Sequence, residues 1–216
     1  RHKDIFPKPE GRFYPYVQFD PKLILNTLEP ITDLNEKIII GEGAFSEVYL
    51  LRHIITKKKY AVKQMNKNEI RKLTKDFLLI KNEINIQGRI IHPNVTRLYN
   101  AIENQNSFYL ILEYASNGSL FDLIKRSNGF NEYDAFYFFI QILNVIDFLH
   151  NNHIIHRDLK PENILISNDY KIKLSDFGWS TDFSDERGRT TYCGTVEYIA
   201  PEILNKEQYG PSIDIW

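Results

Sequence analysis

The chain has 216 residues, of which 43% are hydrophobic and 13% aromatic, so it can bury a sizeable core and is not expected to be disordered. Lys and Arg (27) nearly balance Asp and Glu (28), and the net charge of -1 provides no bulk attraction for nucleic acid or for an anionic membrane. The single cysteine, Cys193, excludes a disulfide within the chain and is typical of a reducing compartment.

The two ends of the sequence favour a fragment of a longer protein. The chain begins with Arg1, has its only methionine at Met65, and stops at Trp216 without a terminating signal. Residues 1–34 contain five prolines and no sustained period. We therefore expect an extended arm that lies on the surface of the domain that follows.

From about Glu36 the sequence predicts a small antiparallel α+β lobe. Strand-like runs occur at 38–40, 48–51, 60–63, 96–102 and 108–113. One helix is predicted over about 73–89, and it ends before His92-Pro93.

The pattern then becomes mainly helical. Asn131 is a good N-cap, because Glu132 and Asp134 fall in the first turn, where the helix dipole favours acidic side chains. Apolar residues at three- and four-residue spacing predict a buried stripe on this helix. They are Phe136, Phe139, Ile140, Leu143 and Ile146.

A glycine-containing segment, 40–48, lies between the first two predicted strands. Gly41 and Gly43 would let the backbone approach phosphate oxygens closely. Ser46 stands where a third glycine is usual in such loops. Taken alone, the segment is better explained as a hairpin turn.

A lysine on the third predicted strand adds a cation. The two-residue period of a strand puts Ala61 and Lys63 on one face, where a small side chain leaves room for a planar base. Glu83 on the predicted helix is a candidate partner for the ammonium. A strand lysine is usually a surface residue, so this pair needs support from elsewhere.

That support comes from the segment 156–163, His-Arg-Asp-Leu-Lys-Pro-Glu-Asn, which lies between short apolar runs. Rigid scaffolds commonly hold reactive groups in such a loop. Asp176-Phe177-Gly178 follows, 13 residues after Asn163. Asn163 and Asp176 carry the hard oxygen ligands that suit Mg²⁺ on a nucleotide.

Six elements in this order make the chain resemble a eukaryotic protein kinase from about residue 36 to residue 216. They are the glycine segment, Lys63, Glu83, His-Arg-Asp, Asp-Phe-Gly and Ala-Pro-Glu at 200–202. The resemblance implies an α+β, bilobal fold, in which a five-stranded antiparallel small lobe with one helix precedes a mostly helical, C-terminally truncated large lobe. The implied bounds are an arm (1–34) and a kinase domain (35–216), with a small lobe (35–113), a hinge (113–116) and part of a large lobe (117–216).

The resemblance also implies the ligands ATP and Mg²⁺ and the roles of single residues. Lys63 would contact the phosphates and pair with Glu83. Asp158 would accept or orient the proton of the substrate hydroxyl, and Lys160 would steady the γ-phosphate. Asn163 and Asp176 would hold Mg²⁺. The nucleotide would be bound by Ile40, Gly41, Glu42, Gly43, Ala44, Phe45, Ser46, Glu47, Val48, Ala61, Lys63, Glu83, Glu113, Ala115 and Leu165.

Finer features resemble the serine/threonine class and, within it, the Aurora group. Lys160 follows Asp158 by two residues, and Thr195 follows Cys193-Gly194, as in serine/threonine kinases. The Aurora-like stretches are Leu110–Ala115, Asp176–Ser180 and Arg189–Thr195. Val196–Ala200 also resembles polo-like and cyclic-nucleotide-regulated kinases. Asp214 is implied to bond the backbone of the His-Arg-Asp loop.

The expected regulatory residues are Arg157, Thr190 and Thr191. A phosphate on Thr191 opposite Arg157 would order the segment through charge-assisted hydrogen bonds. Arg189, two residues before Thr191, suggests autophosphorylation.

We therefore expect an ATP-dependent serine/threonine kinase; the alternative is a truncated, non-catalytic binding or regulatory module. The expected partners are protein substrates with basic residues upstream of the Ser or Thr, together with an activating protein, and neither nucleic acid nor membrane. The expected location is intracellular, in cytoplasm or nucleus, with spindle association by analogy only.

Overall fold

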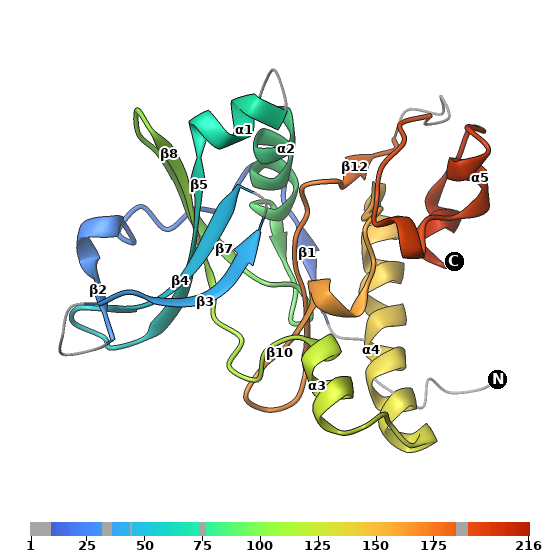
Figure 1. Cartoon of the computed structure of the whole chain (residues 1–216), viewed down its shortest axis with the longest axis horizontal. Helices are drawn as coiled ribbons and strands as arrows, with labels where there is room; N and C mark the ends of the chain where they lie inside the picture. Colours follow the sequence, from blue (N-terminus) through green and yellow to red (C-terminus); the bar gives the residue numbers. More distant parts are fainter. Residues whose placement is uncertain (1–9, 32–35, 44, 74–76, 185–189) are drawn as a thin grey trace. The chain divides into compact units, whose positions relative to one another are not determined.

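The computed structural model describes residues 10–31, 36–43, 45–73, 77–184 and 190–216. The chain divides into two compact units, each described here by itself (Figure 1). The sheet unit comprises Tyr14–Arg89 and Arg97–Tyr114. The helical unit comprises Ala115–Trp216, Ile90–Thr96 and the described part of Arg1–Phe13. The sheet unit ends at Tyr114 and the main part of the helical unit begins at Ala115, within the segment 113–116 that the sequence assigns to the hinge.

The sheet unit is built on an antiparallel sheet with the strand order β2-β4-β5-β8-β7, and β3 pairs with β4. The strands are β2 (Leu28–Pro30), β3 (Ile38–Gly43), β4 (Ser46–His53), β5 (Lys59–Asn66), β7 (Leu98–Glu103) and β8 (Ser107–Glu113). All five predicted strands are present. Hairpins join β3 to β4, β4 to β5 and β7 to β8, whereas α1 and α2 lie in the connection from β5 to β7.

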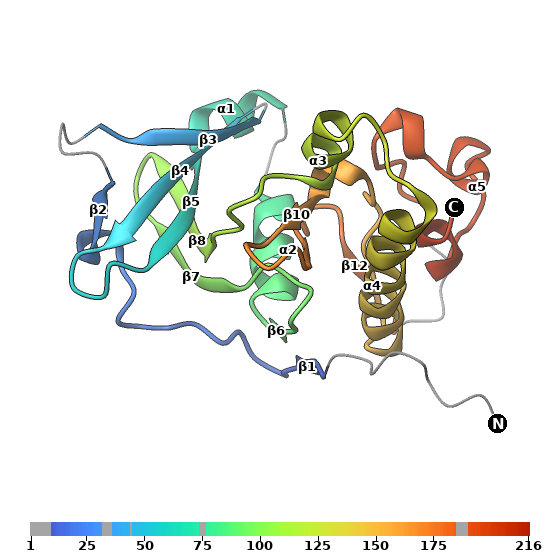
Figure 2. The ribbon, with the colours of Figure 1, turned by 90° about the horizontal axis from the view of Figure 1, so that it is seen from below.

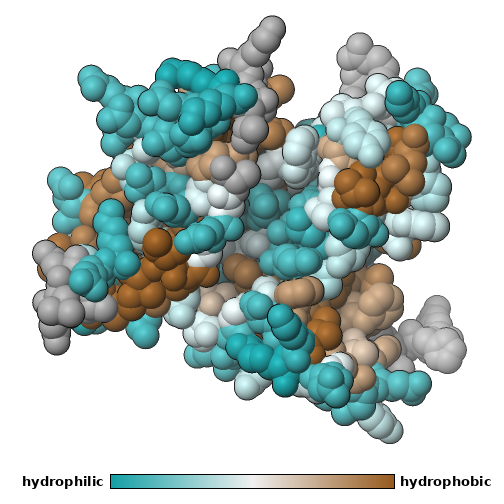
Figure 3. All heavy atoms as spheres, viewed as in Figure 1, coloured by the Kyte–Doolittle hydropathy of each residue, from teal (hydrophilic) through white to brown (hydrophobic). Residues whose placement is uncertain are grey.

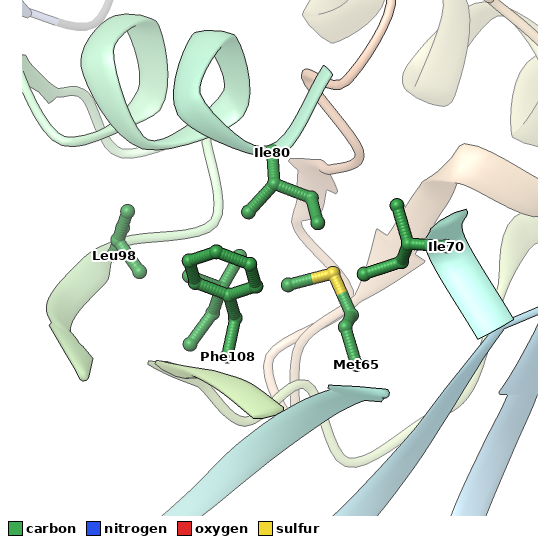
Figure 4. Close-up of a cluster of buried hydrophobic side chains, with 6 residues drawn as sticks. Met65, Ile70, Ile80, Leu98 and Phe108 are labelled. Atoms are coloured by element: carbon green, nitrogen blue, oxygen red, sulfur yellow. The ribbon is translucent and has the colours of Figure 1, made fainter. Parts of the chain in front are cut away.

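One face of this sheet is covered by two helices, α1 (Lys67–Leu73) and α2 (Leu78–Gln87). Buried side chains from both helices and from three strands form the core between them (Figure 4). These are Met65, Ile70, Ile80, Leu98, Phe108 and Leu110. Because α2 packs on this core, the position of every residue on α2 depends on it.

The opposite face is covered by the N-terminal arm. Side chains alternate along a strand, so Tyr60 and Val62 of β5 point away from Ala61 and Lys63. Leu23 of the arm packs against Tyr60 and Val62 and is only 2% exposed. Residues 14–30 of the arm are therefore a layer of the sheet unit rather than a segment resting on a finished domain.

The structure differs from the sequence prediction in two details of this unit. The sheet has a sixth strand, β2, whose Pro30 is tolerated because β2 is an edge strand. The predicted single helix is two helices, and the first starts where β5 ends. Asn66 Oδ1 accepts the backbone N–H of Asn68 at 2.9 Å and of Glu69 at 3.4 Å. The seven residues of α1 are mostly polar, so no apolar period marks this helix in the sequence and only the Asn66 cap indicates its start.

The helical unit contains α3 (Leu120–Arg126), α4 (Glu132–Asn151) and the short α5 (Pro201–Leu204). Three small antiparallel ladders hold its loops in register. They pair β1 (Arg12–Phe13) with β6 (Ile90–Ile91), β9 (Ile154–Ile155) with β12 (Thr181–Asp182), and β10 (Ile164–Ile166) with β11 (Ile172–Leu174). The last two ladders carry the loops that the sequence singles out as reactive.

The predicted start of α4 is confirmed, because Asn131 Oδ1 accepts the backbone N–H of Asp134 at 2.9 Å. The predicted buried stripe is wrong for three of its residues: Phe136, Phe139 and Leu143 are exposed. The residues that α4 buries are Phe138, Val145, Ile146 and Leu149. This helix is apolar around much of its circumference, so its period alone does not select the covered face. Within the described part of the chain, no helix is both long and apolar enough to cross a bilayer.

Leu23 provides a test of the arm as a structural layer. Replacing a buried leucine by alanine removes its packing and leaves a cavity, so Leu23→Ala should lower the free energy of unfolding by about 2–5 kcal/mol. The neighbouring Ile24 is 42% exposed, and Ile24→Ala should change this free energy by less than about 0.5 kcal/mol. Urea unfolding of both variants checks the prediction, and equal effects would contradict it.

Candidate functional site

The residues that the sequence singles out are divided between the two units, and each half has its own geometry. In the sheet unit, the glycine segment forms the β3–β4 hairpin, with Gly41 opposite Val48 and Gly43 opposite Ser46. A Cβ atom on Gly43 would lie 2.7 Å from Ser46 Oγ, so this position accepts only glycine without a shift of the serine. Ala44, at the tip, lies outside the described residues.

The face of the sheet next to this hairpin carries Val48, Ala61 and Lys63. Lys63 lies directly opposite Val48 in the β4–β5 ladder, and Ala61 is two residues along the same strand. Ile40 lies at the β3 bulge between Ile39 and Gly41, and apolar surface gathers over β3 in Figure 3.

Lys63 and Glu83 are brought together by the packing of α2 on the sheet. Lys63 Nζ lies 2.8 Å from Glu83 Oε1 and 3.1 Å from Oε2. The side chains are only 16% and 4% exposed, so each charge needs the other. The pair holds the ammonium group in one place on the sheet, where it can bind an anion.

The remaining residues expected around a nucleotide are shared between the units. Glu113 ends β8, and its Oε2 accepts the backbone N–H of Arg97 at 3.2 Å. Ala115 and Leu165 belong to the helical unit, and Leu165 lies in β10.

In the helical unit, the segment 156–163 forms a compact polar cluster around Asp158. Thr195 Oγ1 donates to Asp158 Oδ1 at 2.7 Å, and Asn163 Nδ2 donates to Asp158 Oδ2 at 2.8 Å. Lys160 Nζ lies 3.3 Å from Asp158 Oδ2 and donates to Thr195 Oγ1 at 2.6 Å. The carboxylate is thus buried, charge-compensated and oriented to accept a hydrogen bond from an alcohol. Thr195 lies 37 residues further along the chain, so local sequence does not predict its contact with Asp158.

The β10–β11 ladder brings Asn163 and Asp176 to the same end of a hairpin. Ile164 pairs with Leu174, so the residues just outside the ladder meet, and Ser175 donates to the Asn163 carbonyl from its N–H and its Oγ, both at 2.9 Å. Asn163 Nδ2 is used in bonds to Asp158, and its Oδ1 is the atom suited to a cation.

Two oxygen-bearing side chains at this point fit Mg²⁺, which keeps several waters and needs few protein ligands. Among the described residues, no group of three or more His, Cys, Asp or Glu side chains is placed to hold a metal ion. Two oxygen donors suit an ion whose remaining ligands are waters and phosphate oxygens.

The backbone on both sides of this cluster is held in unusual conformations. Arg157 has φ 70° and Asp176 has φ 61°, both in the left-handed region. Asp214 stabilises the first of these positions: its carboxylate accepts the backbone N–H groups of His156 and Arg157 at 2.9 and 2.8 Å. It also contacts His150 Nε2 at 2.9 Å.

Arg157 connects this loop to the segment that carries the predicted regulatory threonines. Its guanidinium donates to the Trp179 carbonyl at 2.5 Å and to Tyr209 Oη at 2.9 Å. Burial raises the pKa of Tyr209, so its hydroxyl keeps its proton and donates to the Thr191 carbonyl at 2.8 Å. Thr190 and Thr191 are both exposed. Sequence reasoning missed Tyr209, because nothing near residue 209 marks it as a neighbour of Arg157. Arg189 lies outside the described residues.

Asp214 provides a test of how the reactive loop is held. Asp214→Ala should lower the free energy of unfolding by about 2–5 kcal/mol, because two buried N–H groups lose their acceptor. Hydrogen exchange at the amides of His156 and Arg157 should rise in parallel. Ser212→Ala in the same turn is the control and should change neither quantity; equal effects would exclude this role for Asp214.

Comparison with known proteins agrees with this geometry. Residues 34–216 match the family model described as "Protein kinase domain". An Aurora kinase of Debaryomyces hansenii is 38% identical over 209 residues, which cover 92% of this chain and 50% of the relative. An Aurora kinase of Saccharomyces cerevisiae is 41% identical over 179 residues, covering 82% and 48%.

Similarity is not confined to the Aurora group. An SNF1-related protein kinase catalytic subunit alpha of Arabidopsis thaliana is 38% identical over 177 residues, covering 82% of this chain and 36% of the relative. The chain spans about half the length, or less, of the curated relatives that it matches. The family match covers most of the chain, and the chain therefore belongs to the protein kinase domain family.

Proposed function

We propose that this chain is the part of a serine/threonine protein kinase that transfers the γ-phosphate of ATP to hydroxyl groups of protein substrates. The observation that supports this most directly is the hydrogen bond from Thr195 Oγ1 to Asp158 Oδ1, 2.7 Å long. A buried carboxylate that accepts a hydrogen bond from one alcohol is suited to orient another and to take its proton. Lys160, beside both groups, supplies positive charge where phosphate charge develops.

The other residues bind and position the donor. Phosphoryl transfer requires alignment and charge neutralisation more than covalent chemistry from the protein. Lys63, held by Glu83, would bind the phosphates, and the backbone of the glycine hairpin would approach them closely. Asn163 and Asp176 would hold Mg²⁺, which neutralises phosphate charge when bound.

The similarity to fungal Aurora kinases supports a finer proposal for the whole protein. It would phosphorylate substrates with basic residues upstream of the acceptor, require an activating protein partner, and act inside the cell in cytoplasm or nucleus. Spindle association is proposed by analogy with the Aurora group alone. We also propose that phosphorylation of Thr191 activates the kinase. Thr191 is exposed, and its carbonyl is joined to the Arg157 guanidinium through Tyr209, so a phosphate there has a cation nearby.

Asp158→Asn tests the catalytic proposal. In the full-length protein it should lower the rate of phosphate transfer to a serine peptide by about 10²–10⁴-fold, because the proton acceptor is lost. Nucleotide affinity should stay within about twofold of the unaltered protein. Asp169→Asn, in the exposed β10–β11 turn, is the control and should keep full activity.

The outcome separates the two classes of function. Transfer that is lost in Asp158→Asn while nucleotide still binds supports an enzyme. If the unaltered protein binds nucleotide but transfers no phosphate, the non-catalytic module is supported. If transfer survives in Asp158→Asn, the proposed role of Asp158 is excluded.

Thr191→Ala tests the regulatory proposal. It should abolish the activating phosphate, lower activity at least tenfold, and leave the amides of residues 190–195 poorly protected from hydrogen exchange. Thr190→Ala removes the adjacent hydroxyl and should have the smaller effect on both readouts. Full activity in Thr191→Ala, or an equal loss in both variants, would assign the switch elsewhere.

A further inference from the structure

We propose that residues 14–20 form a strap that holds the C-terminal end of α2 against the sheet and so positions Glu83 for its contact with Lys63. This inference rests on the proposed function only where it predicts an effect on phosphate binding. The strap runs beside α2 and β7 in Figure 2, and all of its contacts described below lie within the sheet unit.

The strap binds the end of α2 through backbone groups. The last carbonyls of a helix have no partner within the helix. The carbonyl of Gly88, the C-cap of α2, accepts the Gln18 N–H at 2.7 Å, and the Arg89 carbonyl accepts the Tyr14 N–H at 2.9 Å. Arg89 Nε returns a hydrogen bond to the Tyr14 carbonyl at 2.7 Å. The strap therefore binds the carbonyl of the C-cap residue of α2 and that of the residue after it.

Side-chain packing reinforces these bonds. Gly88 is in close contact with the strap, because a Cβ atom there would lie 3.0 Å from Val17 Cγ1 and 3.2 Å from Phe19 Cε1. Phe19 also packs on the core cluster that contains Ile80 of α2. A strap residue is thus in contact with both the end of α2 and the core beneath it.

The other side of the strap is anchored to β7 and to the adjoining Arg97. The Asp20 N–H donates to the Tyr99 carbonyl at 2.7 Å, and an Arg97 guanidinium nitrogen donates to the Gln18 carbonyl at 2.6 Å. The buried side chain of Leu23 follows directly and fixes the chain on the sheet. Because the strap is bound to α2 on one side and to the sheet on the other, it sets the separation between them.

Glu83 lies one helical turn before Gln87, the last residue of α2, so it moves with the strapped end. At the other end, the N-cap residue Phe77 makes no side-chain capping bond and is held by an edge-to-face contact of its ring with Phe108. Lys63 stands on β5, which is hydrogen-bonded to β4 and β8 within the sheet and not to α2. Release of the strap should therefore separate Glu83 from Lys63 while the sheet remains folded.

The test uses two substitutions at one position. Gln18→Pro removes the N–H that caps Gly88, whereas Gln18→Ala keeps it and removes only a side chain that bonds the nearby Tyr16 carbonyl. The binding of ATP and of adenosine is measured in the full-length protein by calorimetry. Only ATP carries the phosphates that Lys63 would bind, so the ratio of the two affinities reports the position of the Lys63–Glu83 pair.

We expect Gln18→Pro to weaken ATP binding about five- to tenfold and to leave adenosine binding unchanged, with faster hydrogen exchange across residues 78–87. Gln18→Ala should change none of these. Equal losses of ATP and adenosine affinity in Gln18→Pro would indicate general destabilisation and overturn the proposal. Unchanged amide hydrogen exchange across residues 78–87 in Gln18→Pro would overturn it as well. If Gln18→Pro does not fold, Arg89→Met replaces it, and Arg89→Lys, which restores a donor, should recover part of the affinity ratio.

Glu83→Gln separates this proposal from the proposed function. It should reduce the affinity ratio by a similar factor without changing the strap. If Glu83→Gln leaves the affinity ratio unchanged, the phosphate-binding role of Lys63 is wrong. In that case the comparison of hydrogen exchange in α2 between Gln18→Pro and Gln18→Ala still tests whether the strap holds this helix.

Discussion

The sheet of the first unit is apolar on both faces, and both must be kept from water. Two helices cover one face through Ile70, Ile80 and neighbouring side chains, and Leu23 of the arm covers the other. Burial of each such side chain contributes about 1.5–3 kcal/mol, so neither cover can be removed without a large loss. Because α2 is placed by this requirement, the buried contact between Glu83 and Lys63 is a consequence of how the sheet is covered.

The N-terminal arm affects the Lys63–Glu83 pair because it also contacts α2. The arm continues from the covered face to the end of α2, where its N–H groups bond the carbonyls of Gly88 and Arg89. One continuous stretch of chain thus contributes to the core and also holds the helix that carries Glu83. A buried ion pair contributes little stability on average, but its geometry is exacting. Small displacements of α2 would therefore change the proposed phosphate site before the fold is lost.

In the helical unit, a buried carboxylate has the corresponding role. Asp214 accepts the backbone N–H groups of His156 and Arg157 and thereby holds Arg157, the residue before Asp158, in its left-handed conformation. Tyr209 joins Arg157 to the Thr191 carbonyl, so the loop and the segment that carries Thr190 and Thr191 share one hydrogen-bond network. A charge added at Thr191 would act on a network that is already connected to the reactive loop.

Local patterns in the sequence were sufficient for much of this description. Alternation predicted the five strands around Lys63, and the Asn131 cap predicted where α4 begins. The sequence also grouped Asp158, Asn163 and Asp176 into one candidate site, and hydrogen bonds join their loop and hairpin in the helical unit. These signals are readable because each depends on residues within one strand, one helical turn or one hairpin. The tertiary structure decided which apolar residues of α4 are covered, that Leu23 belongs to the core, and that Tyr209 contacts Arg157. Each of these depends on groups brought together across distant parts of the chain, and no local period encodes which surface another segment will cover.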